Sequence, residues 1–191
     1  MKKDLGVKSF LFPCPVAILG TYDEQGSVNA MNMAWGTLID TNMILCCLTE
    51  EHKTCKNLKA GSDLTIAIAT KELVKESDYF GIDSGNTVKD KFARSGLHVV
   101  KSQHVNAPVI EEYPLTLECK THAIRHDEDG NFFVYAEIVN VLADETILNE
   151  KGMVDVKKLN AILFSQIDNS YYEVGDIVGK AWNLGLPFRG K

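Results

Sequence analysis

The most regular pattern in the chain is an alternation of apolar and polar residues between positions 115 and 142. Residues 115–126 alternate as the two faces of a β-strand do. Residues 127–131 contain an Asp-Gly pair, which is a strong signal for a β-hairpin turn. Residues 132–142 are predicted to return as the longest strand of the protein, with an apolar face that runs from Phe132 to Ile138. The pattern therefore predicts a long antiparallel hairpin.

Shorter strands are predicted in the first half of the chain. Residues 16–22 are rich in apolar side chains, residues 23–26 form a turn, and the chain returns from Ser27 as an antiparallel partner. The run at 43–48 is apolar at nearly every position, so it is expected to lie in the middle of the sheet with both faces covered.

Short helices are expected between the strands. A helix over 52–60 is predicted to end at Gly61 in a left-handed cap, and Thr70 is predicted to cap a helix over 71–80. The other predicted elements are strands at 64–69 and 161–165, a helix at 87–93, and a helical turn at 155–159 capped by Asp155. Many short strands, few helices and no linker favour a mainly β, closed antiparallel barrel that forms a single domain over 1–191.

Composition narrows the range of partners. The chain has 191 residues, 45% hydrophobic and 24% charged, which is ordinary for a globular protein. A net charge of −6 and scattered lysines argue against nucleic acids and anionic membranes as partners. No leader segment and no long apolar run are recognised, so the protein is expected in the cytoplasm.

Cysteine usage agrees with a reducing compartment. Five cysteines without a CxxC pair or a metal-ligand spacing fit neither a disulfide framework nor a zinc site. Cys46 and Cys47 are expected to be small buried residues of the 43–48 strand. Cys55 begins a helix, where the pKa of its thiol could fall, so a redox-active thiol is a minor alternative there.

Common catalytic motifs are missing from the sequence. It contains no G-x-G-x-x-G after a strand, no P-loop, no H-E-x-x-H and no G-x-S-x-G. No catalytic or metal-ligating residue is therefore predicted. A bound redox cofactor remains compatible with the sequence, because such a group carries its own chemistry and needs few protein side chains.

Residues 27–58 form a candidate cofactor cradle. Asn29 and Asn32 lie within a predicted strand, although Asn is depleted in strands. The polar bend of His52, Lys53 and Thr54 opens a helix, whose free N–H groups could meet a phosphate together with the lysine charge. These residues alone indicate a flat, phosphorylated cofactor. Capping of an ordinary helix is the alternative for the bend.

A resemblance to a known family makes this hypothesis more specific. The series that carries it extends over almost the whole chain and consists of 13–21 (PCPVAILGT), Asn29-Ala30-Met31, Ala34-Trp35, 52–58 (HKTCKNL), Asp90-Lys91-Phe92, Ala136-Glu137-Ile138 and Gly179-Lys180-Ala181-Trp182. Each motif is short, but their order and spacing resemble the flavin-reductase-like family of FMN-binding split barrels, which includes flavoredoxin.

The resemblance implies an antiparallel split β-barrel that forms a homodimer with two FMN molecules near the subunit interface. The residues implied to contact FMN are Asn29, Met31, Asn32, Met33, Ala34, Trp35, Thr49, His52, Lys53, Thr54, Asn57 and Lys91. Trp35 could instead fill the core, and Lys91 could be an ordinary solvated lysine. Many relatives have an arginine in the bend where this chain has His52-Lys53, which keeps charge without a bidentate fork. Tyr171 and Tyr172 also resemble flavin-approaching positions, but packing is favoured for them.

The implied function is electron transfer from NADH or NADPH through FMN to an acceptor that the sequence does not identify. Without a dinucleotide-binding fold, the nicotinamide would have to stack on the exposed flavin face. Two alternatives stay open. One is a flavoredoxin-type carrier that takes electrons from a redox protein, and the other is a cofactor-free barrel that serves as an interaction module.

Overall fold

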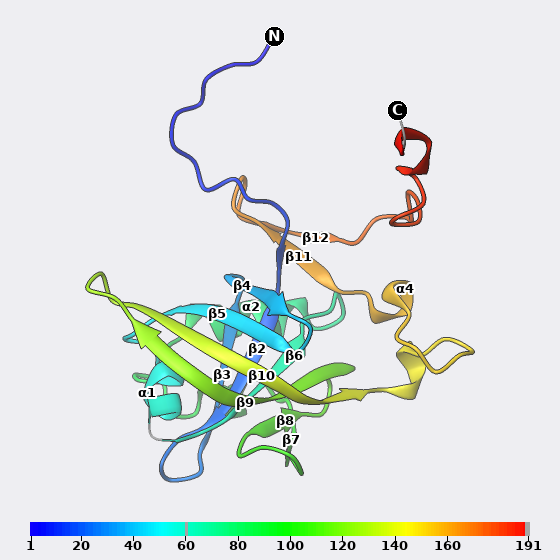
Figure 1. Ribbon diagram of the computed structural model, residues 1–191. Helices are drawn as coiled ribbons and strands as arrows, with labels where there is room; N and C mark the ends of the chain where they lie inside the picture. The colour runs from blue at the N-terminus through cyan, green and yellow to red at the C-terminus, as the bar shows by residue number, and fades with distance from the viewer. Residues whose placement is uncertain (60, 190–191) are drawn as a thin grey trace.

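Seven strands form one antiparallel sheet in a computed structural model that describes residues 1–59 and 61–189 (Figure 1). Their order across the sheet is β3-β2-β6-β9-β10-β5-β4. The strands are β2 (Ala17–Tyr22), β3 (Val28–Met33), β4 (Gly36–Asp40), β5 (Met43–Thr49), β6 (Leu64–Ile68), β9 (Leu115–His126) and β10 (Asn131–Ala143). The predicted mainly β, antiparallel class is confirmed.

The sheet is not closed into a full barrel. β3 and β4 form its two edges and are not paired with each other, although only Ala34 and Trp35 separate them in the chain. The prediction of a closed barrel is therefore wrong, and a split barrel describes the sheet. No ladder of backbone hydrogen bonds joins β3 to β4, and side chains line the gap between them. We call this gap the seam.

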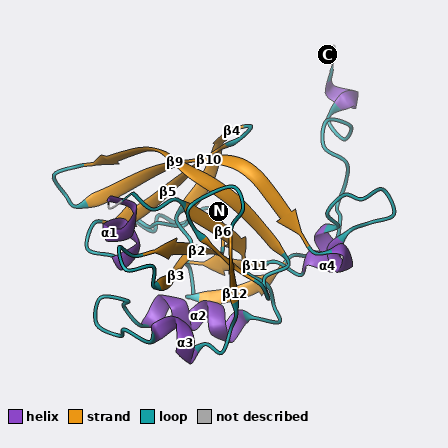
Figure 2. Cartoon of the chain, turned by 90° about the horizontal axis from the view of Figure 1, so that it is seen from below, coloured by secondary structure: helices purple, strands orange, loops and turns teal. Residues whose placement is uncertain are grey.

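Smaller elements surround this sheet. β1 (Cys14–Pro15), β11 (Ile162–Ser165) and β12 (Ser170–Glu173) form a three-stranded sheet, and β7 (Val99–Lys101) pairs with β8 (Pro108–Ile110). The helices are α1 (Lys53–Lys59), α2 (Val74–Ile82), α3 (Lys91–Arg94) and α4 (Val156–Leu159), with 3-10 turns η1 (Glu145–Ile147) and η2 (Leu186–Phe188). Figure 2 shows α2 and α3 side by side, next to β3.

Two apolar clusters stabilise the fold. One lies inside the curved sheet and includes Leu19, Cys46 and Phe132, all fully buried. The other lies on the opposite face, where Ile18 and Phe80 pack between the sheet and α2. This second cluster fixes α2 beside β3, and that placement forms one wall of the site described below.

The long hairpin and two caps were predicted correctly. β9 and β10 pair from His126 with Phe132 to Leu115 with Ala143, and 127–130 connect them. Gly61 has φ +91°, the left-handed conformation expected after α1. The Asp155 carboxylate accepts hydrogen bonds from the backbone N–H groups of Lys157 and Lys158 at the start of α4.

Two helix predictions were wrong in position. The helix predicted over 71–80 begins at Val74 and ends at Ile82. Thr70 does not cap it, because the backbone of Thr70 forms a β-bridge with Ala161. The helix predicted over 87–93 is reduced to the single turn of α3, preceded by irregular turns.

β5 differs from its prediction as a strand covered on both faces. It lies between β10 and the edge strand β4, and residues 43–48 alternate between half-buried and buried. Cys46 is buried in the inner core, whereas Cys47 is half-buried and faces the seam. The apolar residues of 43–48 therefore pack into the core on one face of β5 and contribute to a cavity on the other.

A buried carboxylate joins β9 to the loop after β7. Glu118 is 1% exposed and accepts hydrogen bonds from Ser102 Oγ and Asn140 Nδ2, and it also contacts His104 Nδ1. Three polar partners compensate for burial of the charge. None of these four side chains lines the cavities described below, so the network is structural.

Both terminal segments extend from the same side of the barrel (Figure 1). They carry exposed apolar side chains, among them Leu11, Ile177, Val178 and Trp182. Within 1–59 and 61–189, none of the helices has the length and apolar character that crossing a bilayer requires.

Candidate functional site

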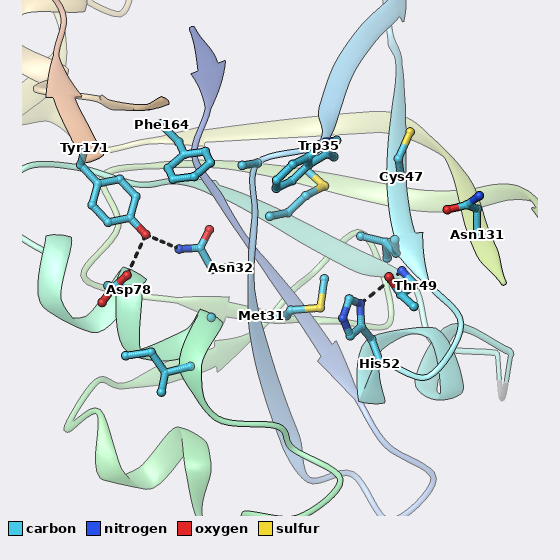
Figure 3. A pocket seen from close by; sticks show the side chains of 15 residues that line it. Met31, Asn32, Trp35, Cys47, Thr49, His52, Asp78, Asn131, Phe164 and Tyr171 are labelled. Atoms are coloured by element: carbon cyan, nitrogen blue, oxygen red, sulfur yellow. Dashed lines mark hydrogen bonds between the residues drawn. The ribbon is translucent and has the colours of Figure 1, made fainter. Parts of the chain in front are cut away.

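The seam contains a cavity of about 610 Å³, shown in Figure 3. We call it the ring cavity. β3, the Ala34-Trp35 link and β5 supply most of its wall, and α2, β11, β12, His52 and the first residue of β10 supply the rest. Its lining is mostly apolar or neutral, and its volume lies in the range of small-molecule sites. The lining residues include Met31, Met33, Trp35, Cys47, Ile82 and Phe164.

A smaller cavity of about 180 Å³ adjoins the first. We call it the cationic pocket. The two share Met31, Asn32, His52, Gly81 and Ile82 in their linings, so together they form one continuous groove. The residues that line only the smaller cavity include Asn29, Lys53, Thr54, Gly85 and Lys91. One end of the groove is therefore wide and mostly uncharged, and the other is narrow and carries two lysines and the carboxylate of Asp83.

Strand periodicity explains how β3 serves the whole groove. Asn29 and Met31 lie on the face toward the barrel interior, and Asn32 lies on the opposite face, toward α2. The amide Nδ2 of Asn29 donates to Thr54 Oγ1 at 3.0 Å and that of Asn32 donates to the Ser77 carbonyl at 2.8 Å. The two asparagines thus connect the edge strand to α1 and α2.

Lys91 is an unusual lysine in the cationic pocket. It is 5% exposed, and its ammonium donates to the Phe80 carbonyl at 2.8 Å. Burial lowers its pKa to about 8, against the opposing effect of the Asp83 charge. A buried lysine without a close carboxylate destabilises the empty pocket. An anion in the pocket would compensate for that cost.

The neighbouring cations behave differently. Lys53 forms an ion pair with Asp23, with Nζ 3.3 Å from Oδ2. The Thr49 backbone N–H donates to Nδ1 of His52 at 3.4 Å, and burial together with the Lys91 charge lowers the pKa of His52. His52 is therefore a neutral hydrogen-bonding side chain at the junction of the two cavities, and Lys53 and Lys91 supply the positive charge.

Gly85 leaves space that a side chain would fill. A Cβ atom at this position would lie 2.3 Å from Asn29 Oδ1 and 3.2 Å from Lys53 Cγ. Asn29 has little freedom to move away, because it is 6% exposed and holds Thr54. Glycine here keeps the cationic pocket open. The pattern of the loop after α2 gave no sign of this role.

Eleven of the twelve residues implied by the resemblance line the groove. They are Asn29, Met31, Asn32, Met33, Ala34, Trp35, Thr49, His52, Lys53, Thr54 and Lys91. Asn57 is not brought to it: its side chain is buried and donates to Thr21 Oγ1 at 2.9 Å inside the barrel. Trp35 is 56% exposed and lines the cavity instead of filling the core.

Sequence reasoning missed part of the lining. Asp78 and Tyr171 line the ring cavity, and Phe164 contacts the rings of both Trp35 and Tyr171. Both Tyr171 and Tyr172 resemble flavin-approaching positions, but packing was favoured for them; Tyr171 lines the ring cavity, whereas Tyr172 lies outside both cavities and contacts Phe12. No local pattern marks Asp78 or Phe164, because only the fold brings α2, β11 and β12 to β3.

Thiol and metal chemistry have no support at this site. Burial raises the pKa of Cys55 to about 12, so its thiol stays protonated and the alternative of a redox-active Cys55 is not supported. In the ranges that the structure describes, no three His, Cys, Asp or Glu side chains are placed to hold a metal ion.

The fold and the groove define a class of protein: an antiparallel split barrel with a mostly apolar cavity at its seam and a cationic pocket beside it. The model of the flavin reductase like domain matches residues 9–160. The chain belongs to this family.

Solved structures agree with this family assignment. Flavoredoxin of Desulfovibrio vulgaris (Miyazaki F) is 33% identical, with a TM-score of 0.88 over 97% of this chain and 100% of that one. Flavoredoxin from Methanosarcina acetivorans is 27% identical, with a TM-score of 0.88 over 98% of this chain and 100% of that one. An FMN-binding protein from Thermus thermophilus shares the fold at 16% identity, with a TM-score of 0.75 over 94% of this chain and 98% of that one.

Proposed function

We propose that the protein binds FMN in the groove and transfers electrons from NADH or NADPH through it to an acceptor. The observation that carries this proposal is the continuity of the ring cavity with the cationic pocket that holds the buried Lys91. The small volume of that pocket favours a terminal phosphate, hence FMN over a dinucleotide flavin.

The residues present fit this cofactor. The unbalanced charge of Lys91 and the space beside Gly85 suit a phosphate group, and the aromatic and methionine side chains of the ring cavity suit an apolar ring. When bound, FMN supplies the hydride and electron chemistry. The chain's own contribution is to orient the ring, to exclude water with Met31, Trp35 and Phe164, and to hold the phosphate with Lys53 and Lys91.

A spectrum and an anaerobic titration test the proposal. The purified protein reconstituted with FMN should show a band near ~450 nm that bleaches on addition of NADH or NADPH without oxygen. A protein that binds FMN but is not bleached by either nucleotide is the flavoredoxin-type carrier, which the likeness to two flavoredoxins favours as the second candidate. Absence of FMN binding would leave the cofactor-free interaction module.

The pH dependence of FMN binding is expected to report on Lys91. Its pKa of about 8 in the empty pocket should rise when a phosphate binds, so protonation and FMN binding favour each other. Below about pH 8 the affinity should be constant, and above it the affinity should fall by up to about tenfold per pH unit. Quenching of FMN fluorescence between about pH 7 and 9 measures this, since the phosphate is already dianionic there.

Lys91→Arg is the matched variant for that titration. Arginine keeps its proton throughout this range, so the variant's affinity should not fall above pH 8. The same fall in both proteins would assign the pH dependence to another group.

We also propose a homodimer. The terminal segments place Ile177, Val178, Trp182 and Leu184 in solvent at exposures of 66–97%, well outside the barrel core. Apolar residues on extended segments are typical of an interface between subunits. The partner subunit would then cover the open side of the seam near Trp35.

All five cysteines are free thiols, which supports a reducing, cytoplasmic location.

Removal of the C-terminal segment is expected to dissociate this dimer. Light scattering after size exclusion should give a dimer mass for the intact chain and a monomer mass for a variant truncated after Glu173. Within 174–189, the described residues beyond that point, no side chain belongs to either buried cluster, so the truncated barrel should keep its circular dichroism spectrum. A monomeric intact chain would contradict the proposal.

A further inference from the structure

Three polar side chains form one wall of the ring cavity, at the end away from His52 (Figure 3). They are Asn32 of β3, Asp78 of α2 and Tyr171 of β12. We call them the polar wall. Asn32 is among the residues that the resemblance implies for FMN, but the function proposed above assigns no role to Asp78 or Tyr171. Three separate elements converge on this wall, so its geometry is set by the tertiary fold.

All side-chain hydrogen-bond donors of the polar wall are already used. Nδ2 of Asn32 donates to the Ser77 carbonyl at 2.8 Å and to the Tyr171 hydroxyl at 3.3 Å. Because a carbonyl can only accept, Ser77 fixes the orientation of the Asn32 amide. The Tyr171 hydroxyl donates its single hydrogen to Asp78 Oδ1 at 2.9 Å.

What remains at the wall is a pair of acceptors. Within the described part of the chain, Oδ1 of Asn32 and Oδ2 of Asp78 have no hydrogen-bond partner. Burial, followed by the bond to Asp78, raises the pKa of Tyr171 to about 12, so the hydroxyl keeps its hydrogen and stays a donor to Asp78. A ligand group at this wall must therefore supply hydrogen-bond donors.

The negative charge of the ring cavity also favours a ligand group that supplies hydrogen-bond donors. Asp78 is the only residue with a full charge among its lining residues, because both lysines belong to the cationic pocket and His52 is neutral. Phe164 lies beside Tyr171, with ring centroids 5.9 Å apart, and beside Trp35 at 6.2 Å. The wall thus offers aromatic surface next to two acceptors and one negative charge, which suits an uncharged amide on a flat ring and disfavours a carboxylate.

We propose that Asn32 and Asp78, with Tyr171 as a positioning residue, form the specificity site for the carboxamide of the nicotinamide electron donor. Its NH₂ group donates to the two free oxygens, and a donor that has a carboxylate in place of the carboxamide is rejected. This inference rests on the proposed function, because it assigns a contact to the dinucleotide that delivers the hydride.

The test compares two ligands that differ only in this group. The first is the oxidised form of whichever dinucleotide bleaches the bound flavin, and the second is its deamido counterpart, which has a carboxylate on the ring. Neither can reduce the flavin, so dissociation constants can be measured at equilibrium from the change in flavin absorbance. Anaerobic bleaching rates with the two reduced forms give a second measurement.

FMN-loaded wild-type protein should bind the carboxamide form about 30-fold or more tightly than the carboxylate form. In Asp78→Asn this ratio should fall toward one, because the new amide can donate to a carboxylate. Tyr171→Phe should lower the ratio partly, since Asp78 loses its fixed orientation. Glu76→Gln removes the same charge from α2 outside both cavities and should keep the wild-type ratio. The dissociation constant of FMN should stay within about twofold in all variants.

The outcomes separate the inference from the function. If neither reduced dinucleotide bleaches the flavin, the nicotinamide-dependent function fails and the inference fails with it. Suppose instead that a reduced dinucleotide bleaches the flavin. The inference alone is then overturned if the wild-type protein binds the carboxamide and carboxylate forms equally, or if Glu76→Gln loses discrimination as Asp78→Asn does. A large change in FMN affinity in Asp78→Asn, with the ratio unchanged, would assign the wall to the flavin itself.

Discussion

Replacing both Lys53 and Lys91 with alanine is expected to weaken FMN binding by about 10²- to 10⁴-fold. Each lysine can make a charge-assisted hydrogen bond to the phosphate, and such bonds contribute about 1.5–3 kcal/mol each. Lys91 should account for the larger share, because it is 5% exposed and has no close carboxylate, whereas Lys53 is already paired with Asp23. Fluorescence titration with FMN measures the loss.

Two controls make this prediction specific to the phosphate. Riboflavin lacks the phosphate, so its affinity should be nearly the same in the wild-type and double-alanine proteins. Lys56→Ala removes a lysine from the same helix, but Lys56 binds Asn86 outside the groove, so FMN affinity should not change. Equal losses for FMN and riboflavin would mean that the double variant distorts the ring cavity and that the phosphate is held elsewhere.

Phe132→Ala is expected to lower the free energy of unfolding by about 3–5 kcal/mol. Phe132 is fully buried in the inner cluster, with the Lys59 ammonium 5.4 Å from the centre of its ring. Truncation removes that burial and leaves a cavity that the paired strands β5, β9 and β10 cannot close.

Urea unfolding followed by circular dichroism measures this loss. Phe133→Ala is the matched control, since Phe133 is the next residue on β10, points to the other face and is only half-buried. Its loss should be clearly smaller. Similar losses for the two variants would contradict the assignment of the barrel interior as the main core.

The sequence predicts the strands better than the helices, for a physical reason. β9 and β10 were located to within a residue, because alternation and an Asp-Gly turn are local signals. The start of α2 was misplaced, because Thr70 has the composition of a cap but its backbone is used in a bridge to Ala161, 91 residues away in the chain. Closure of the sheet was also predicted wrongly, since no local pattern shows which edge strands remain unpaired.

The site could be predicted only where it is local in sequence. The strand with Asn29 and Asn32 and the bend at Lys53 are short motifs, and the fold brings both to the groove. Asn57 lies in the same motif, but helical periodicity turns it toward Thr21. Asp78 and Tyr171 are 93 residues apart, so only the tertiary structure could bring them to one cavity. That FMN contacts the cradle residues named in the sequence analysis stays a prediction, as does the single domain over 1–191.

The open seam links cofactor supply to heat resistance. Because the ring cavity draws its lining from the edge strand β3 and from β5 across the seam, a flavin there would hold together two parts of the sheet that no backbone ladder joins. A ligand bound only by the native state raises the melting temperature in proportion to the logarithm of its concentration above the dissociation constant. Cells short of flavin would therefore hold a population of this protein that melts earlier and exposes two strand edges to aggregation.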